Sequence, residues 1–419
     1  MKVKMNYKFY KEQLILKTFI LFLFLFKLYY NECLINSLID LNYPRVFILE
    51  NDYILMVTTK GIYSFNQTLD NIIFSYNFTD DQKMTEIKFM DNNNNTNNKI
   101  DSIIQVEISQ FTEGDKYVIC LANKYLYLLT NKGQLLYNKK LSDLNSDYSI
   151  NLIAYKFSGN NYYFIIAFNY YLNDGFNNKN VLHLRYYQIS IDNNQNQPNN
   201  KYEIQLINSI NLFPLFTDLI TLSGLSCQII NSYVGKYLAC FEIVENFKRI
   251  ELLASNPDNN YFLMPCFFYD FTSNKNAIYI KTSLNADKTK VLICFTTDIL
   301  KCIYFDVNLN LFYDITNLKT DFCNINYFGF NLYYFNKANE NVLTCISTDK
   351  SYFDILRLNE NFEILNNDNN TFSNCISHNI HSLIYISEYR QYSAFINSNC
   401  EGKAITIYLL STTFCILQE

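Results

Sequence analysis

The chain has no tryptophan, three histidines and only nine glycines among its 419 residues. Without tryptophan it lacks the Ser-x-Asp-x-Gly-x-Thr-Trp boxes of sialidase-type hydrolases and the Trp-Asp signature of WD40 repeats. Because glycine is scarce and asparagine abundant, we expect asparagine and aspartate to form most of the turns, since both tolerate positive φ. Beyond the N-terminal region, no apolar stretch approaches the length of a membrane-spanning helix.

Motifs for catalysis are also missing. There is no C-x-x-C pair, which argues against a zinc or thioredoxin-like site. The nucleophile elbow, the Walker A loop, the dinucleotide-binding glycines and the H-E-x-x-H motif are absent, and no alternating carboxylates indicate a Ca²⁺ loop. His378 and His381 precede a strand, where a spacing of three separates their faces, and His183 reads as structural. We expect no catalytic residue, no metal and no cofactor; carboxylates paired by the fold are left open.

The charge balance excludes one class of partner. The formal net charge is −5, from 34 basic and 39 acidic residues, and the basic residues are scattered. Neither a groove that tracks phosphates nor a polybasic membrane patch is visible. We therefore expect no nucleic-acid partner.

The N-terminus predicts export. Five lysines precede an apolar core at residues 18–26, and Lys27 interrupts it. A basic region followed by a short apolar core is typical of a secretory signal. Residues 1–33 are therefore interpreted as a signal peptide or, if uncleaved, as a signal anchor; a buried structural segment is the third alternative.

The most informative feature present is a repeated apolar stretch that ends in cysteine. Copies lie at residues 117–120, 237–240, 291–294 and 342–345, and three copies without the cysteine begin at Tyr53, Tyr162 and Tyr392. Each lies among runs of alternating apolar residues bounded by Asn, Asp or Gly, which predicts short antiparallel strands. Four such strands per unit of roughly forty to fifty residues are typical of propeller blades.

We therefore predict an all-β fold, a β-propeller of seven blades with four antiparallel strands each, over residues 34–415. The second strand of each blade should be buried on both faces, and the fourth should be the exposed edge. The last unit lacks a clear fourth strand, which residues 34–41 would supply. Six or eight blades, a β-sandwich pair and an open solenoid are the alternatives. The blades are expected at about residues 42–80, 100–140, 148–212, 222–270, 275–318, 325–366 and 378–415.

Cysteine usage agrees with export, because ten of the twelve cysteines lie between Cys227 and Cys415. The cysteines at the fourth position of the second strands should all lie at the same distance from the axis of the ring, in different blades. They are therefore not expected to pair with one another, and each should pair within its own blade. Each such bond closes a loop of roughly ten to thirty residues and contributes on the order of 3 kcal/mol. For Cys120 and Cys266, a buried thiol and a disulfide are equal alternatives. The candidate pairs are Cys227 with Cys240, Cys294 with Cys302, Cys323 with Cys345, Cys375 with Cys400, and Cys33 with Cys415.

Surface sites are suggested by two further patterns. Glycosylation sequons begin at Asn66, Asn77, Asn94 and Asn369. Exposed aromatic residues on loops at the ends of the ring are candidate ligand contacts, and the long loop expected in the third blade carries Tyr170, Tyr171 and Phe176.

One resemblance adds to this interpretation. The segment at residues 41–49, its continuation at residues 53–65, and the pattern from Cys227 to Glu242 resemble the propeller ectodomains of large, uncharacterised surface proteins of ciliated protozoa. In that family, the propeller is followed by EGF-like repeats and a transmembrane helix, and neither follows here. The resemblance implies an extracellular location and brings no catalytic residues. It leaves open a secreted protein, an N-terminally tethered one, and a fragment of a longer chain.

Taken together, the sequence predicts a non-catalytic binding or adhesion module, secreted or on the cell surface. The ligand is an unidentified protein or carbohydrate, and the domain is expected to be monomeric. A membrane would be engaged only through an N-terminal anchor or a further C-terminal region. A secreted carbohydrate-active enzyme and a structural spacer domain are the alternatives.

Overall fold

The structure of the chain is a computed structural model. It describes residues 45–48, 53–58, 60–65, 72–82, 106–110, 117–122, 124–141, 144, 150–156, 162–173, 178–192, 201–212, 222–233, 235–244, 248–255, 262–272, 279–297, 299–315, 327–335, 339–347, 352–371, 381–386, 391–398 and 406–411. Within these residues every regular element is a β-strand, and the strands form seven antiparallel sheets in chain order, here named sheets A to G.

The first three sheets have four strands each. Sheet A comprises β1 (Arg45–Ile48), β2 (Ile54–Val57), β3 (Gly61–Phe65) and β4 (Ile72–Asn77). Sheet B comprises β5 (Val106–Gln110), β6 (Tyr117–Ala122), β7 (Tyr125–Thr130) and β8 (Leu135–Lys140). Sheet C comprises β9 (Ile150–Lys156), β10 (Tyr162–Asn173), β11 (Asn178–Asp192) and β12 (Lys201–Leu212).

The remaining sheets follow the same plan. Sheet D comprises β13 (Leu222–Ser232), β14 (Gly235–Val244), β15 (Arg249–Ser255) and β16 (Phe262–Asp270). Sheet E comprises β17 (Tyr279–Leu284), β18 (Lys290–Thr296), β19 (Leu300–Asp306) and β20 (Leu311–Asp314). Sheet F comprises β21 (Tyr327–Phe335), β22 (Glu340–Ser347), β23 (Tyr352–Leu358) and β24 (Ile364–Thr371). Sheet G comprises β25 (His381–Ile386), β26 (Gln391–Ser398) and β27 (Thr406–Ser411).

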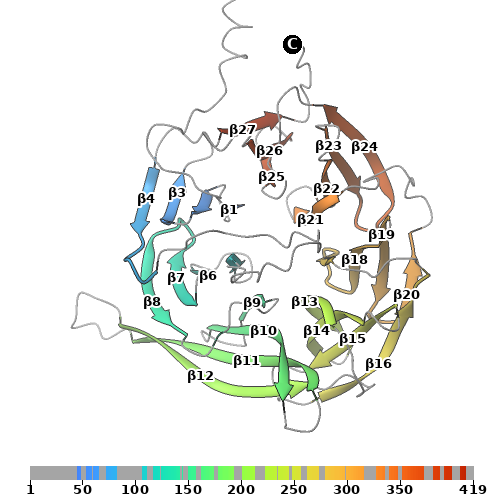
Figure 1. The fold of residues 1–419 in the computed structure, drawn as a ribbon, viewed down its shortest axis with the longest axis horizontal. Coiled ribbons are helices and arrows are strands. Elements are labelled where there is room, and N and C mark those ends of the chain that lie inside the picture. Colours follow the sequence, from blue (N-terminus) through green and yellow to red (C-terminus); the bar gives the residue numbers. More distant parts are fainter. Residues whose placement is uncertain are drawn as a thin grey trace, which may run out of the picture.

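The sheets are arranged around a common centre in a propeller-like ring (Figure 1). The first strand of each sheet lies toward the middle and the last lies outside. Neighbouring first strands contact one another from β5 through β9, β13, β17 and β21 to β25, and β25 also contacts β1. The first and last sheets of the chain are therefore neighbours. The expected fourth strand at residues 34–41 lies outside the described residues.

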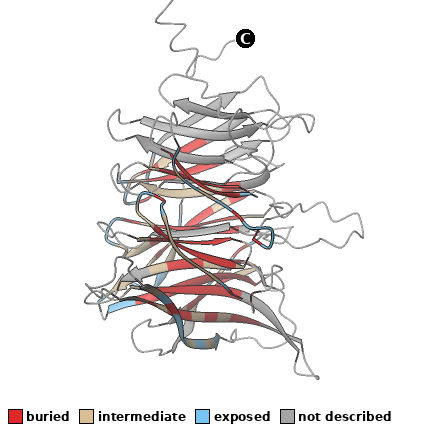
Figure 2. Cartoon of the chain, turned by 90° about the vertical axis from the view of Figure 1, so that its left-hand side faces the viewer, coloured by how far each residue is buried: buried red, intermediate tan, exposed pale blue. Residues whose placement is uncertain are grey.

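Where the structure describes their side chains, the second strands are buried as predicted apart from residues at their ends, because adjacent sheets pack face to face. Every residue of β2 is buried, as are all but the first residue of β6 and all but the two end residues of β18. Separate hydrophobic cores fill the spaces between sheets A and B, B and C, C and D, D and E, and E and F. In Figure 2 the buried positions run through the middle of the stacked sheets.

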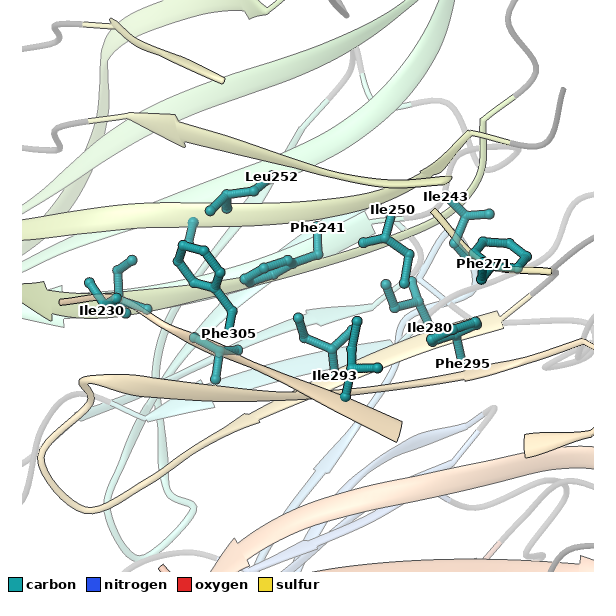
Figure 3. Packing of buried hydrophobic residues seen from close by; sticks show 14 of the residues in the cluster. Ile230, Phe241, Ile243, Ile250, Leu252, Phe271, Ile280, Ile293, Phe295 and Phe305 are labelled. Carbon is teal, nitrogen blue, oxygen red and sulfur yellow. The ribbon is translucent and has the colours of Figure 1, made fainter. Parts of the chain in front are cut away.

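The core between sheets D and E shows how this packing works (Figure 3). Phe241 of β14 and Phe305 of β19 meet edge to face, with ring centroids 6.2 Å apart. Ile250 and Ile293 fill the same space and are fully buried. Edge-to-face and tilted ring pairs, such as Phe271 with Phe295 at 5.0 Å, hold the two sheets together.

The fourth strands share a feature that the sequence interpretation missed. In sheets A, B, C and F the register between the third and fourth strands shifts by one residue, which leaves a β-bulge on the outer strand. The skipped residue is aliphatic each time, and so is the residue before it. A bulge bends an edge strand and hinders pairing with another chain. The skipped residues are Ile73, Leu136, Ile207 and Leu365.

The turns differ from expectation in one respect. Six non-glycine residues of the described chain have positive φ, and only two of these are asparagines; the others are Lys124, Lys248, Lys288 and Phe362. Asparagine and aspartate act instead as side-chain acceptors at the start of the turn. Asn285 accepts from the main-chain N–H of Thr289 and of Lys290, at 2.9 and 2.8 Å. The side chain holds the turn, and a lysine can then take the left-handed position.

Candidate functional site

The most unusual polar group in the described residues is a pair of glutamates in sheet D. Glu242 of β14 and Glu251 of β15 are directly opposite each other in the antiparallel register. Side chains of such a pair lie on the same face, with Cβ atoms about 4.5–5.5 Å apart. Strand pairing therefore brings two carboxylates together that are nine positions apart in the sequence.

The face that carries the pair is the one that packs on sheet C. Positions along a strand alternate between faces, so Glu242 shares its face with Leu238 and Cys240, and Glu251 shares its face with Leu253. These three neighbours belong to the core between sheets C and D, together with Ile165 and Leu184 of sheet C. The two glutamates thus lie next to the apolar residues of sheet D that pack against sheet C.

Both carboxylates are shielded from solvent and lack hydrogen bonds. Glu242 is 0% exposed and Glu251 is 2% exposed. None of their four carboxylate oxygens has a hydrogen-bond partner among the described residues. Buried polar groups in native proteins are nearly always hydrogen-bonded, so two orphan carboxylates side by side call for a physical explanation.

Burial controls the electrostatics of the pair. Burial raises the pKa of Glu242 from an ordinary 4.5 to about 8, and the negative charge of the neighbouring Glu251 is the second cause of this shift. Burial also raises the pKa of Glu251, and the positive charge of Arg249 partly opposes that shift. Both carboxyls therefore resist ionisation in this environment.

Arg249 is held by other groups. Its Nε atom lies 2.5 Å from Oδ1 of Asp270, and Nη2 lies 3.2 Å from Oδ2. The guanidinium also stacks over the ring of Phe268 at 3.9 Å. The hydrogen bond to Asp270 is the main reason that the pKa of Arg249 is raised. The carboxylate of Asp270 thus already balances the charge of Arg249.

The chemistry open to the pair follows from its burial. Paired carboxylates serve glycosidases as acid and base when a sugar can reach them. With 0% and 2% exposure, Glu242 and Glu251 offer no surface to such a substrate. The arrangement is instead suited to holding a proton or a small cation. In the described part of the chain, no three His, Cys, Asp or Glu side chains converge to hold a metal.

His183 is a second polar centre, and its contacts occupy both ring nitrogens. Nδ1 donates to Oδ1 of Asn211 at 2.5 Å, and Nε2 accepts from Arg185 Nε at 3.2 Å and from the Ser209 hydroxyl at 3.0 Å. Burial, the largest cause, lowers the pKa of His183, and Arg185 lowers it further. Burial and Arg185 thus both favour the neutral ring, which links β11 to Asn211 and Ser209 of β12. His381 begins β25, and His378 lies outside the described residues.

Two of the predicted disulfides are present. Cys227 is bonded to Cys240 and Cys294 to Cys302, and in each case the two cysteines are opposite each other on adjacent strands. Cys120 is a buried thiol. Cys345 lies in β22, but its side chain is outside the described part, as are Cys33, Cys323, Cys375, Cys400 and Cys415.

The predicted surface residues have mixed positions. Asn77 ends β4 in an exposed position and accepts a hydrogen bond from the Tyr63 hydroxyl at 3.0 Å. Asn369 lies within β24. Asn66 and Asn94 are outside the described residues, and Phe176 is as well.

The loop expected around Tyr170 and Tyr171 is instead a strand. Both residues belong to β10, where they pair with Val181 and Asn180 of β11. The hairpin of β10 and β11 continues past the last pair between β10 and β9, at Phe168. The interpretation of these tyrosines as loop residues was wrong because the strand pairing extends farther than the turn residues indicated.

The sequence interpretation missed Glu242 and Glu251, although a signal was present. Residues 237–244 form an apolar run that Glu242 alone interrupts, and Glu251 interrupts the apolar run at residues 250–254. Charged residues are almost never fully buried unless they are paired, so a carboxylate inside such a run is a candidate site.

Comparisons with known proteins identify no family. No family model matches the chain, and no curated protein does either. Among solved structures, the WD40 domain of SCAP from fission yeast is 10% identical with a TM-score of 0.42, covering 90% of this chain and 89% of its own. The Neurospora crassa Pan2 WD40 domain is 10% identical with a TM-score of 0.41, covering 84% of each chain. Likenesses at this level carry no argument about function. No helix among the described residues is long and apolar enough to cross a membrane.

Proposed function

We propose that this chain is an exported, seven-bladed β-propeller that acts as a binding or adhesion module at or outside the cell surface. The observation that carries the proposal is the pair of disulfides that link adjacent strands within sheets D and E. Disulfides form and persist in oxidising compartments and are rare in the cytosol. The basic and apolar N-terminal segment is consistent with entry into such a compartment.

The seven-bladed ring rests on sheet order and on one closing contact. Sheets A to G follow the chain, and β1 of the first sheet contacts β25 of the last. Each of sheets A to E packs against the next through its own core. A ring built in this way presents rigid hairpins at both ends of its central axis.

The binding role is supported by the hairpin of β10 and β11. These strands have 12 and 15 residues, longer than any strand of the other sheets, and their pairing carries Tyr170 and Tyr171 beyond the end of β9. Aromatic residues on a rigid support are typical of binding hot spots. We propose that this hairpin contacts a protein or carbohydrate ligand, and that the chain acts without nucleic acid and as a monomer.

The export proposal is tested by producing the full chain in a eukaryotic secretory host. We expect the protein in the medium or on the outer cell surface, with glycans on some of the four sequons. Accumulation of reduced, unglycosylated protein in the cytosol would contradict the proposal.

The binding proposal is tested on arrays of glycans and extracellular protein domains. We expect a ligand whose affinity falls about tenfold or more in Tyr170→Ala or Tyr171→Ala, the size typical of a hot-spot residue. Exposed Tyr233→Ala, on the turn after β13, is the matched control. Turnover of an arrayed glycan would instead favour the carbohydrate-active enzyme.

A further inference from the structure

We propose that Glu242 and Glu251 form a binding site for a calcium ion between sheets C and D. The strands place the two carboxylates directly opposite each other on the face that packs against sheet C. Both are at least 98% buried, and none of their oxygens has a hydrogen-bond partner among the described residues. This inference does not depend on the proposed binding function; the affinity expected below rests on the proposed extracellular location.

Charge balance is the first reason for a divalent cation. Two ionised carboxylates carry two negative charges in an apolar layer, where an unpaired charge is strongly destabilising. Arg249 is the nearest described cation on this face, and it forms its bidentate ion pair with Asp270. An ion of charge +2 would neutralise the pair without drawing Arg249 away from Asp270.

Hydrogen bonding is the second reason. The structure places no hydrogen bond between the two carboxyls, so protonation in this arrangement would remove the charge but leave the O–H donors and the carbonyl oxygens unsatisfied. Unsatisfied buried groups keep their full desolvation penalty. A coordinated cation satisfies the oxygens and the charge together, which protons alone do not achieve.

The donor atoms select the class of ion. Carboxylate oxygens favour hard cations, and the neighbouring Cys240 is bonded to Cys227 and so supplies no thiolate for zinc. Mg²⁺ keeps several waters and demands octahedral geometry, whereas Ca²⁺ accepts bidentate carboxylates in a flexible shell. Two bidentate glutamates provide four oxygens, and main-chain carbonyls or water would complete the coordination.

The position of the pair gives an ion a short path of entry. Only one residue pair, Ile243 with Ile250, separates Glu242 and Glu251 from the last pair of the β14–β15 ladder, Val244 with Arg249. The site therefore lies near one end of sheet D. A bound ion would link β14 and β15 near their ends, where these strands contact sheet C.

The test uses the full chain, stripped of metal with EDTA and titrated with Ca²⁺ by calorimetry, with thermal unfolding followed in parallel. We expect saturable binding with one ion per chain by about 1 mM, the range of weak extracellular calcium modules. Glu242→Gln and Glu251→Gln should each weaken binding by about tenfold or more, because each removes a charged ligand. The exposed Glu203→Gln on β12 is the matched control and should leave binding unchanged.

Thermal unfolding, measured with and without Ca²⁺, distinguishes a variant that has lost the ion from one that folds poorly. Ca²⁺ should raise the unfolding temperature of the wild-type chain and of Glu203→Gln, and should raise that of Glu242→Gln and Glu251→Gln much less. Absence of binding to the wild-type chain at about 10 mM Ca²⁺, well above the range of known modules, would overturn the proposal. Binding that both glutamine variants retain at full strength would also overturn it.

Discussion

At the scale of single residues, asparagine side chains stabilise turns in this chain, where glycine is scarce. Asn285 accepts two main-chain hydrogen bonds and is itself buried, with Lys288 in the left-handed conformation inside the same turn. Asn359 does the same for the N–H groups of Asn361 and Glu363, and Phe362 takes the left-handed position there. The asparagine-rich composition therefore has a structural use, although asparagines take only two of the six positive-φ positions of non-glycine residues in the described chain.

The Asn285 turn gives a direct test. Asn285→Ala removes three side-chain hydrogen bonds from a buried turn, and we expect a loss of about 1–3 kcal/mol in the free energy of unfolding. Chemical denaturation measures the loss. Asp287→Ala, exposed in the same turn, is the control and should change stability by less than about 0.5 kcal/mol. Equal effects of the two changes would contradict the role assigned to the Asn285 side chain.

His183 predicts a dependence of stability on pH. Its pKa is lowered in the folded chain, so the unfolded chain binds the proton more readily. Stability should be complete above the unfolded pKa of about 6.5 and should decrease as pH falls toward the lower folded value. Protonation would also turn Nε2 from an acceptor into a donor facing Arg185 and Ser209.

Unfolding at a series of pH values from about 7.5 to 5 measures this decrease, because it spans the unfolded pKa of histidine. His183→Gln should flatten the slope, since no titrating ring remains. Arg185→Gln should reduce it, since the repelling charge is gone. An unchanged slope in both variants would show that another group titrates.

At the scale of elements, the fourth strand of several sheets lies at the outer edge and carries two consecutive aliphatic residues at its bulge. The bulges at Ile73, Leu136 and Leu365 lie one residue pair from the turn between the third and fourth strands, and the bulge at Ile207 lies six pairs from it. In β12 the bulged Ile207 is 51% exposed, whereas Ile204 is 0% exposed and belongs to the core between sheets B and C. The bulge thus separates an inward aliphatic residue from an outward one within a single strand.

These two isoleucines form a matched pair for mutation. Ile204→Ala should lower the free energy of unfolding by about 2–4 kcal/mol, because it opens a cavity in the core. Ile207→Ala should change it by less than about 0.5 kcal/mol, because half of the side chain is already in solvent. A large effect at Ile207 would mean that the bulge is packed in solution.

The sequence predicts elements better than it predicts contacts between them. The alternating runs placed the strands, and the apolar second strands are buried because each lies between two neighbouring sheets. Cys227 and Cys240 could be paired from the sequence because a single hairpin connects their strands. The pairing of Glu242 with Glu251 could not be predicted from the sequence, because the register between β14 and β15 depends on the length of the turn between them. The bulges escaped notice because a one-residue shift leaves the apolar pattern almost unchanged.

At the scale of the molecule, packed sheets form a propeller-like ring, and disulfides link strands within two of the sheets. Five interfaces between consecutive sheets have their own cores, and the contact of β1 with β25 brings the ends of the ring together. The disulfides of sheets D and E fasten adjacent strands within two of these sheets. The export proposal depends on these bonds more than on any other feature.

Peptide mapping of the natural protein by mass spectrometry, without reduction and after alkylation of thiols, tests this claim most directly. We predict linked peptides that contain Cys227 with Cys240 and Cys294 with Cys302, and an alkylated Cys120. Alkylation of all four cysteines of these pairs, in protein taken from its natural compartment, would contradict the account.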